Sequence, residues 1–142
     1  MTVAEQDPAV YQPIDEDRRL IMIKILEGFP DNVVAASASG TITRHDYDAV
    51  LIPQVESTAK RHPKIRCYYE IGADFAGMEP RAIWEDFRVA AEYWIRWERV
   101  AVVTDVVWIA HVVNVFRFLM PGEIRVFPLS GKETARAWIA AP

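Results

Sequence analysis

The spacing of hydrophobic positions along the chain changes repeatedly between two periods, and this alternation predicts a sheet covered by helices. Short runs of apolar residues predict five strands, at 19–27, 33–39, 64–71, 98–104 and 123–129. Apolar residues that recur at helical spacing predict four helices, at 43–62, 80–97, 106–120 and from Ser130 onward. This order predicts an α/β domain with a mostly parallel sheet, in which the first two strands form an antiparallel hairpin.

Capping side chains are predicted at three of the four helix starts. Thr43 with Asp46, and Ser130 with Glu133, match the capping box, in which a hydroxyl and a later carboxylate satisfy free backbone N–H groups. Asp105 stands directly before the 106–120 helix and is predicted to cap it. The beginnings of these three helices are therefore expected near these residues.

Two prolines have different expected effects on their helices. Pro53 lies inside the 43–62 helix and predicts a kink, because proline lacks a backbone donor and clashes with the preceding turn. Pro80 suits the first helical position, so residues 72–79, with two glycines, are predicted to be a loop before it. The apolar face of the helix that follows is predicted to hold Ile83, Phe87, Ala90, Trp94 and Trp97, widened by Trp84, Ala91 and Ile95.

Acidic residues are concentrated at the beginning of the chain. Residues 1–17 have no Lys or Arg and carry five acids: Glu5, Asp7, Asp15, Glu16 and Asp17. The net charge of the whole chain is −4, so the remainder is nearly neutral. We expect residues 1–18 to be a flexible acidic extension and 19–142 to be a single domain. Lys and Arg form no stripe or long run, which argues against nucleic acid as a partner.

The cysteine content and the hydrophobic runs bear on location. Cys67 is the single cysteine, so no internal disulfide can form, which suits a reducing compartment. The first residues have no basic and apolar pattern of a signal peptide, and no apolar run reaches the ~18–20 residues of a membrane span. We therefore expect a cytoplasmic protein.

The sequence lacks the motifs that usually accompany catalysis or cofactor binding. It has no GxGxxG or P-loop phosphate-binding motif, no Cys/His cluster for zinc, and no GxSxG nucleophile motif. The predicted strand ends supply few carboxylates, and the remaining enzymatic hypothesis uses Asp105 with Glu70 or His111. We therefore expect a non-enzymatic protein that needs no cofactor or metal.

The segment 106–120 is unusual because most of its circumference is apolar. On a helix its polar side chains fall within an arc of about 120°, and these are His111, Asn114 and Arg117. A surface helix ordinarily has a narrower apolar face than this. The surplus is expected to contact the neighbouring 80–97 helix, a partner chain, a hydrophobic ligand or a lipid surface.

Four sequence blocks resemble one known family. They are ILEGFPDNVVAASASGTITRHDYDAVLIP (25–53), YYEIGADFAGMEPRAIWED (68–86), WERVAVVTDVVWI (97–109) and FLMPGEIRVFPL (118–129). Together they make the chain similar to the SpoIIAA-like proteins, a bacterial family with the STAS-type fold, over about residues 21–140. The resemblance implies a sheet of about five strands with about four helices mainly on one face.

The same resemblance implies a regulatory or binding role. The fold is similar to that of anti-sigma-factor antagonists and, more distantly, to CRAL-TRIO lipid-binding domains. Antagonists carry a phosphorylatable serine at the start of the helix after the third strand, but residues 72–80 contain no Ser or Thr. A phosphorylation switch of that type is therefore not expected.

Two functional hypotheses follow. The first is a domain that binds a small hydrophobic or lipid-like ligand, with peripheral membrane association, in which 106–119 and 72–79 gate the site. The second is a STAS-type protein-interaction module that forms a homodimer or binds a regulatory partner. For the first hypothesis, the predicted ligand-binding residues are Phe75, Met78, Trp84, Trp108, His111, Val112, Phe116, Leu119 and Met120.

Overall fold

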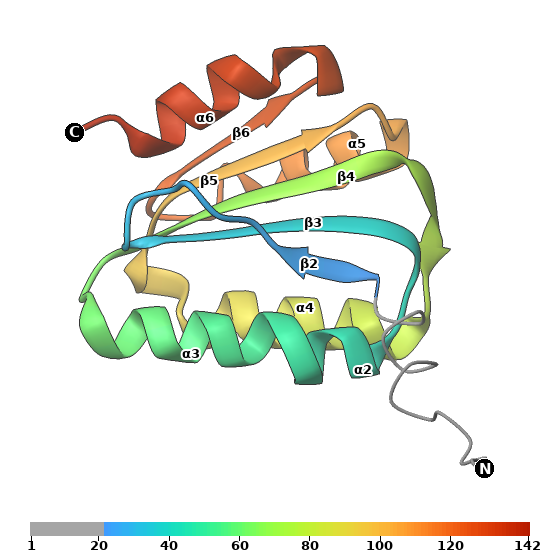
Figure 1. Ribbon diagram of the computed structural model, residues 1–142, viewed down its shortest axis with the longest axis horizontal. Helices are drawn as coiled ribbons and strands as arrows, with labels where there is room; N and C mark the ends of the chain where they lie inside the picture. The colour runs from blue at the N-terminus through green and yellow to red at the C-terminus, as the bar shows by residue number, and fades with distance from the viewer. Residues whose placement is uncertain (1–21) are drawn as a thin grey trace, which may run out of the picture.

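A five-stranded sheet forms the centre of the molecule, in a computed structural model that describes residues 22–142 (Figure 1). The strands lie side by side in chain order: β2 (Ile23–Ile25), β3 (Val33–Ile42), β4 (Ile65–Met78), β5 (Trp97–Thr104) and β6 (Glu123–Phe127). β2 is antiparallel to β3, and the other neighbours are parallel. The predicted α/β fold class and its opening hairpin are confirmed. The extension predicted at residues 1–18 lies outside the described residues.

Helices cover both faces of the sheet unequally. One face is covered by α3 (Ile52–Arg61), α4 (Pro80–Glu92) and α5 (Val107–Phe116), which share one hydrophobic core cluster. The opposite face is covered by α6 (Lys132–Ala140), whose Ala135 and Ile139 belong to a second cluster. Figure 1 shows α6 across the sheet from α3 and α4. The arrangement agrees with the expectation of helices mainly on one face.

The alternation of side chains along β3 and β4 explains the two clusters. Successive residues of a strand point to opposite faces, so Val33 and Ala35 pack toward α6 while Val34 and Ala36 pack toward the other helices. Tyr68 of β4 is fully buried on the α6 face. Buried apolar residues on both faces are typical of a central parallel sheet.

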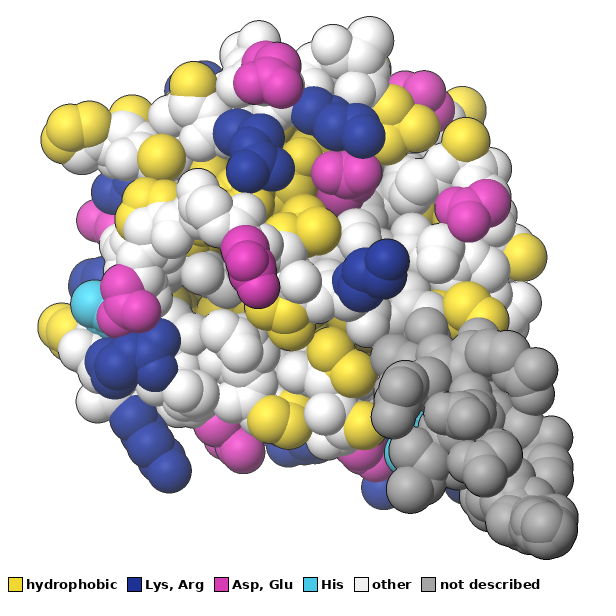
Figure 2. Space-filling model, viewed as in Figure 1, with side chains coloured by type: hydrophobic (Ala, Val, Ile, Leu, Met, Phe, Trp, Pro, Cys, Tyr) yellow, Lys and Arg dark blue, Asp and Glu magenta, His cyan; other side chains and the backbone are white. Residues whose placement is uncertain are grey.

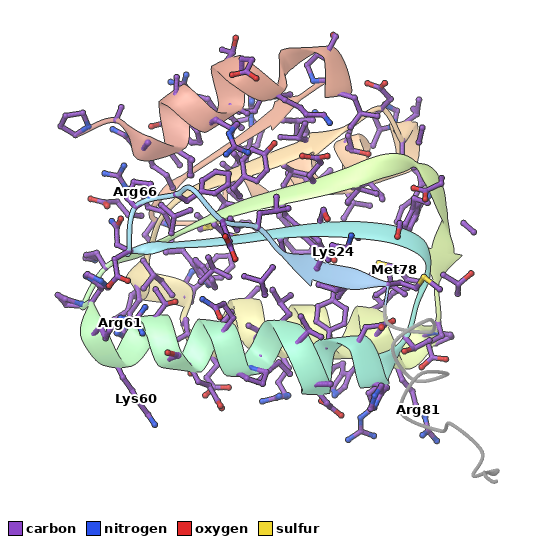
Figure 3. All side chains as sticks on the ribbon, viewed as in Figure 1. Lys24, Lys60, Arg61, Arg66, Met78 and Arg81 are labelled. Atoms are coloured by element: carbon purple, nitrogen blue, oxygen red, sulfur yellow. The ribbon has the colours of Figure 1, made fainter. Side chains whose placement is uncertain are left out.

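Two arginines of the sheet hold the end of α6. Arg66 on β4, labelled in Figure 3, donates from Nη1 to the carbonyl of Ile139 at 2.9 Å. Arg99 on β5 donates from Nη1 to the carbonyl of Trp138 at 2.8 Å. The last carbonyls of a helix have no partner within the helix and carry partial negative charge, so guanidinium groups stabilise them.

The disturbance predicted at Pro53 takes the form of a wider helical turn. The short helix α2 (Arg44–Asp46) continues through a π-helical turn, Tyr47–Leu51, into α3. In that turn the N–H of Ile52 donates to the carbonyl of Tyr47, five residues earlier. Pro53 follows at the beginning of α3, where its missing N–H is tolerated.

Residues 72–79 do not form the predicted loop, because β4 continues as far as Met78. The extended end of β3 supplies its partner: Gly40 lies opposite Phe75, and Ile42 lies opposite Met78, after register shifts near Gly40. Figure 3 labels Met78 where β4 leaves the sheet. The neighbouring strand thus overrides the local glycine signal, and a gating loop at this position is ruled out.

The capping predictions were correct at one helix of three. The Thr43 side chain accepts from the N–H of Asp46 at 3.3 Å, and the Asp46 carboxylate accepts from the N–H of Thr43 at 2.7 Å. At α6 the prediction was wrong, because the N-cap is Gly131 and neither Ser130 nor Glu133 makes a capping hydrogen bond.

Asp105 was also predicted incorrectly as a helix cap. Its Oδ1 accepts from the backbone N–H of Leu129 at 3.1 Å, which ties the end of β5 to the segment after β6. The N-cap of α5 is Val106, whose N–H donates to Oγ1 of Thr104 at 3.0 Å. α5 therefore begins without a side-chain cap, and the Thr104 hydroxyl bonds only the residue that precedes its first turn.

Candidate functional site

α5 presents most of its side chains to solvent. It packs against β5 and β6, and Ile109 is its single buried residue. From α5 through the following turn, the exposed apolar side chains are Val107, Trp108, Val112, Val115, Phe116, Phe118 and Leu119. We call these seven residues the α5 surface. The expectation that this helix has more apolar perimeter than its own domain buries is confirmed.

The neighbouring helix does not cover the α5 surface. Among the α4 side chains that the structure describes, Ala82 and Val89 are buried, whereas Ile83 and Trp84 are 50% and 63% exposed. The prediction that Ile83 belongs to the buried stripe was therefore wrong, because the helix turns the smaller Ala82 toward the sheet at this point. α5 packs mainly on β5 and β6, and its exposed apolar side chains stay uncovered by α4.

Half-buried apolar side chains of β4 lie beside α5. Phe75 of β4 is half-buried, and its ring centroid lies 6.4 Å from that of Trp108, which is 50% exposed. Met78 is also half-buried and packs against the core. Met120 is 8% exposed and belongs to the core cluster, so it supports the surface from beneath instead of facing solvent.

The predicted site residues thus divide by location. Five lie exposed on α5 or just after it: Trp108, His111, Val112, Phe116 and Leu119. Trp84 lies exposed on α4. The predicted ligand-binding set did not include the exposed residues Ile83, Val107, Val115 and Phe118, since helical spacing alone does not show which side of an all-apolar helix the sheet will bury.

The ionisable side chains in the segment that carries the α5 surface are all basic. The predicted polar stripe, His111 with Asn114 and Arg117, is exposed. The Arg117 guanidinium carbon lies 5.1 Å from the ring centroid of Phe118. No Asp or Glu occurs between Asp105 and Glu123. By contrast, Lys/Arg and Asp/Glu side chains are interspersed on the face seen in Figure 2.

Glu70 and His111, the two alternative partners of Asp105 in the enzymatic hypothesis, lie on opposite faces of the sheet. Glu70 accepts from the Tyr68 hydroxyl at 2.9 Å and lies 3.1 Å from Nζ of Lys132, all on the α6 side of the sheet. His111 lies on α5, across the sheet. Burial and the adjacent Glu70 raise the pKa of Tyr68 well above its ordinary value, so the hydroxyl stays a neutral donor. This group fixes α6 to β4.

Other positions offer little for the predicted ligand. A hollow of about 310 Å³ between α3 and the end of α4 is lined mainly by polar or charged side chains: Glu56, Ala59, Lys60, Tyr93 and Arg96. Arg96 is engaged there by the carbonyls of His62 and Pro63. Among the side chains that the structure describes, at 22–84 and 88–142, no three of His, Cys, Asp or Glu gather as metal ligands would.

The parallel sheet with one antiparallel edge strand and an unequal helical cover defines an α/β domain of the STAS type. A family model described as SpoIIAA-like matches residues 33–140, and the chain therefore belongs to the SpoIIAA-like family. A similar solved structure is that of an uncharacterized protein of the DUF3478 family from Shewanella loihica PV-4, which has a SpoIIAA-like fold. The two are 23% identical with a TM-score of 0.66, over 82% of this chain and 91% of that one.

That degree of identity supports the fold alone. The comparison with curated proteins gave no match. Across the described residues, every helix falls short of the combined length and apolarity needed to cross a bilayer.

Proposed function

We propose that this domain is a non-enzymatic binding module whose α5 surface binds a lipid-like ligand at the surface of a membrane. The observation that carries the proposal is the exposure of seven apolar side chains on α5 and the turn after it. Water-exposed apolar patches of this kind are uncommon on monomeric proteins unless they meet another apolar surface.

The energetics favour a shallow insertion. Burying a Leu, Val or Phe side chain contributes roughly 1.5–3 kcal/mol, so three or four such side chains suffice for reversible membrane binding. Phe118 is 79% exposed in the turn after α5, which makes it the most accessible of these anchors. Trp108 suits the boundary between headgroups and acyl chains, because its ring is apolar and its indole N–H is a donor.

The charge of the surface supports lipid as the occupant. The ionisable side chains between Asp105 and Glu123 are His111 and Arg117, both exposed. A cationic group beside apolar anchors is attracted to anionic headgroups, and no carboxylate in this segment opposes that attraction. Anionic lipid is therefore the expected partner.

Vesicle flotation tests the proposal. The wild-type protein is expected to float with vesicles that contain an anionic phospholipid, and more weakly with vesicles of a zwitterionic phospholipid alone. The double substitution Trp108→Ser and Phe118→Ser should abolish flotation. Ile95→Ser is the comparison variant, because Ile95 is also a highly exposed apolar residue but lies after α4 and is not one of the seven residues of the α5 surface.

Three results would overturn the proposal. The first is a wild-type protein that floats with neither kind of vesicle. The second is a loss of flotation with Ile95→Ser as large as that of the double variant. The third is a protein that ignores vesicles but forms a dimer disrupted by Phe116→Glu, which would favour the STAS-type protein-interaction function for this surface instead.

A further inference from the structure

β6 forms an open edge of the sheet. It is hydrogen-bonded to β5 on one side, and within residues 22–142 no other backbone segment bonds to its outer side. Glu123 and Arg125 are exposed and point toward the α6 face, where the Arg125 guanidinium lies 4.8 Å from the Trp138 ring centroid. An open edge presents backbone N–H and C=O groups that another strand can pair with.

We propose that a second copy of this chain pairs with this edge, β6 against β6, antiparallel about a two-fold axis through Ile124. A two-fold axis perpendicular to the sheet keeps each face continuous, so only residues that point to the same face can lie opposite each other. With the axis at Ile124, Glu123 of each copy lies opposite Arg125 of the other. Each acidic side chain of one strand therefore lies opposite a basic side chain of the other strand.

The alternative registers are less favourable. An axis at Arg125 would place two like charges directly opposite each other, which destabilises a strand pair. An axis at Val126 would place Arg125 opposite Phe127. The charges of the edge strand thus select the register with its axis at Ile124.

The ion pair already present in one copy does not compete strongly. Arg125 lies 2.9 Å from Oε2 of Glu123 within the same strand, and both side chains are about half exposed. Exposed ion pairs of this kind contribute little. In the dimer the same four side chains would form two cross-strand pairs. We call the line along which the two β6 strands meet the seam, and there the outward backbone N–H and C=O groups of β6 also pair.

The seam leaves the α5 surface uncovered. Trp108 points toward β4, since its ring contacts that of Phe75. On the helix, Ala110 and Asn114 lie roughly 200–240° from Trp108, so they face the β6 side. The two-fold axis places both α5 surfaces on the same side of one continuous sheet. The dimer therefore stands independently of the proposed lipid binding, and its failure would leave that proposal intact.

Sedimentation velocity over a concentration series measures dimerisation, and variants that exchange the charges at positions 123 and 125 test the proposed β6–β6 pairing. Arg125→Glu alone and Glu123→Arg alone should each weaken dimerisation about tenfold or more, because each places like charges across the seam. The double variant E123R/R125E should restore the wild-type dimer. An equimolar mixture of the two single variants should form a heterodimer, since one copy then carries two acids and the other two bases.

Controls separate this seam from other effects. Glu133→Arg changes an exposed charge on α6, outside the seam, and should leave the dimer unchanged. Circular dichroism checks that each variant is folded. A wild-type protein that stays monomeric throughout the series would overturn the proposal. So would a double variant as weak as the single ones, or a dimer disrupted by Phe118→Ser but not by Arg125→Glu.

Discussion

The carboxylate of Asp46 accepts a hydrogen bond from the backbone N–H of Met22 at 2.8 Å, and this bond joins the helical segment to the residue before β2. The same carboxylate accepts from the N–H of Thr43 at 2.7 Å and from its hydroxyl at 2.9 Å. Asp46 is fully buried. Three donors therefore compensate the burial of one carboxylate, and the helix cap also positions the edge strand.

Replacing Asp46 by Ala should lower the free energy of unfolding by roughly 2–4 kcal/mol, because three donors lose their acceptor in a buried setting. Urea denaturation measures the change. Asp48→Ala is the control, since Asp48 is exposed and its ion pair with Arg44 spans 3.4 Å at the surface. That variant should stay within about 0.5 kcal/mol of wild type. Equal losses in both variants would contradict this account of Asp46.

Asp31 should make the protein less stable in acid. Hydrogen bonds from Arg61 and His62 hold the pKa of the Asp31 carboxyl below its ordinary value. A lowered folded-state pKa stabilises the fold above the unfolded-state pKa, and this contribution is lost as the pH falls through the folded value. Below about pH 4 the urea midpoint should therefore fall more for wild type than for Asp31→Asn.

Arg61→Gln provides a second test of the same cluster, because it removes the guanidinium whose hydrogen bond does most to lower the pKa of Asp31. The acid sensitivity of this variant should resemble that of Asp31→Asn. If both variants follow the wild-type curve below about pH 4, the Asp31 cluster does not govern acid sensitivity.

Gly122 should tolerate no larger residue. A Cβ at this position would lie 2.2 Å from the carbonyl oxygen of Trp97, which is backbone and cannot move aside. We expect Gly122→Ala to cost about 3 kcal/mol or more, or to prevent folding. Gly131→Ala is the matched control: its nearest contact would be Pro128 at 3.4 Å, and we expect it to be near neutral. Thermal unfolding of the two variants gives the comparison.

Two adjacent residues just after α5 should differ in their effect on stability, because one is buried in the core and the other is exposed on the α5 surface. Met120 is 8% exposed, and Met120→Ala should cost about 2–5 kcal/mol of stability through the cavity it leaves. Leu119 is 64% exposed, and Leu119→Ala should change stability by less than about 0.5 kcal/mol. Chemical denaturation of both variants is the measurement. A large loss for Leu119→Ala would mean that this side chain belongs to the core.

Much of the fold could be predicted because its signals are local. The alternation of strand and helix periods gave the order of elements, and the capping box at Thr43 depends on residues three positions apart. The failures involve distant partners. Asp105 bonds to Leu129 instead of its own helix, and residues 72–78 become strand because β3 lies beside them. A window along the sequence contains neither partner.

The candidate site was predictable in part for the same reason. The excess of apolar residues in 106–120 is a property of composition, and their exposure followed. The orientation of α4 was not predictable, because Ala82 instead of Ile83 is directed toward the sheet. The sheet accepts the smaller residue where the helix approaches closely, a matter of tertiary packing that hydrophobicity does not encode.

The π-helical turn before Pro53 has a consequence for the angular setting of the whole helical segment. One added residue rotates everything upstream by about 100° relative to α3. Asp46 before the turn, Tyr47 at its first position and Val55 after it are all buried. An uninterrupted α-helix over the same residues would swing the Asp46 carboxylate away from Met22 and Thr43. The π-helical turn before Pro53 thus sets the rotation of the helix so that the residues on both sides of the turn face the sheet.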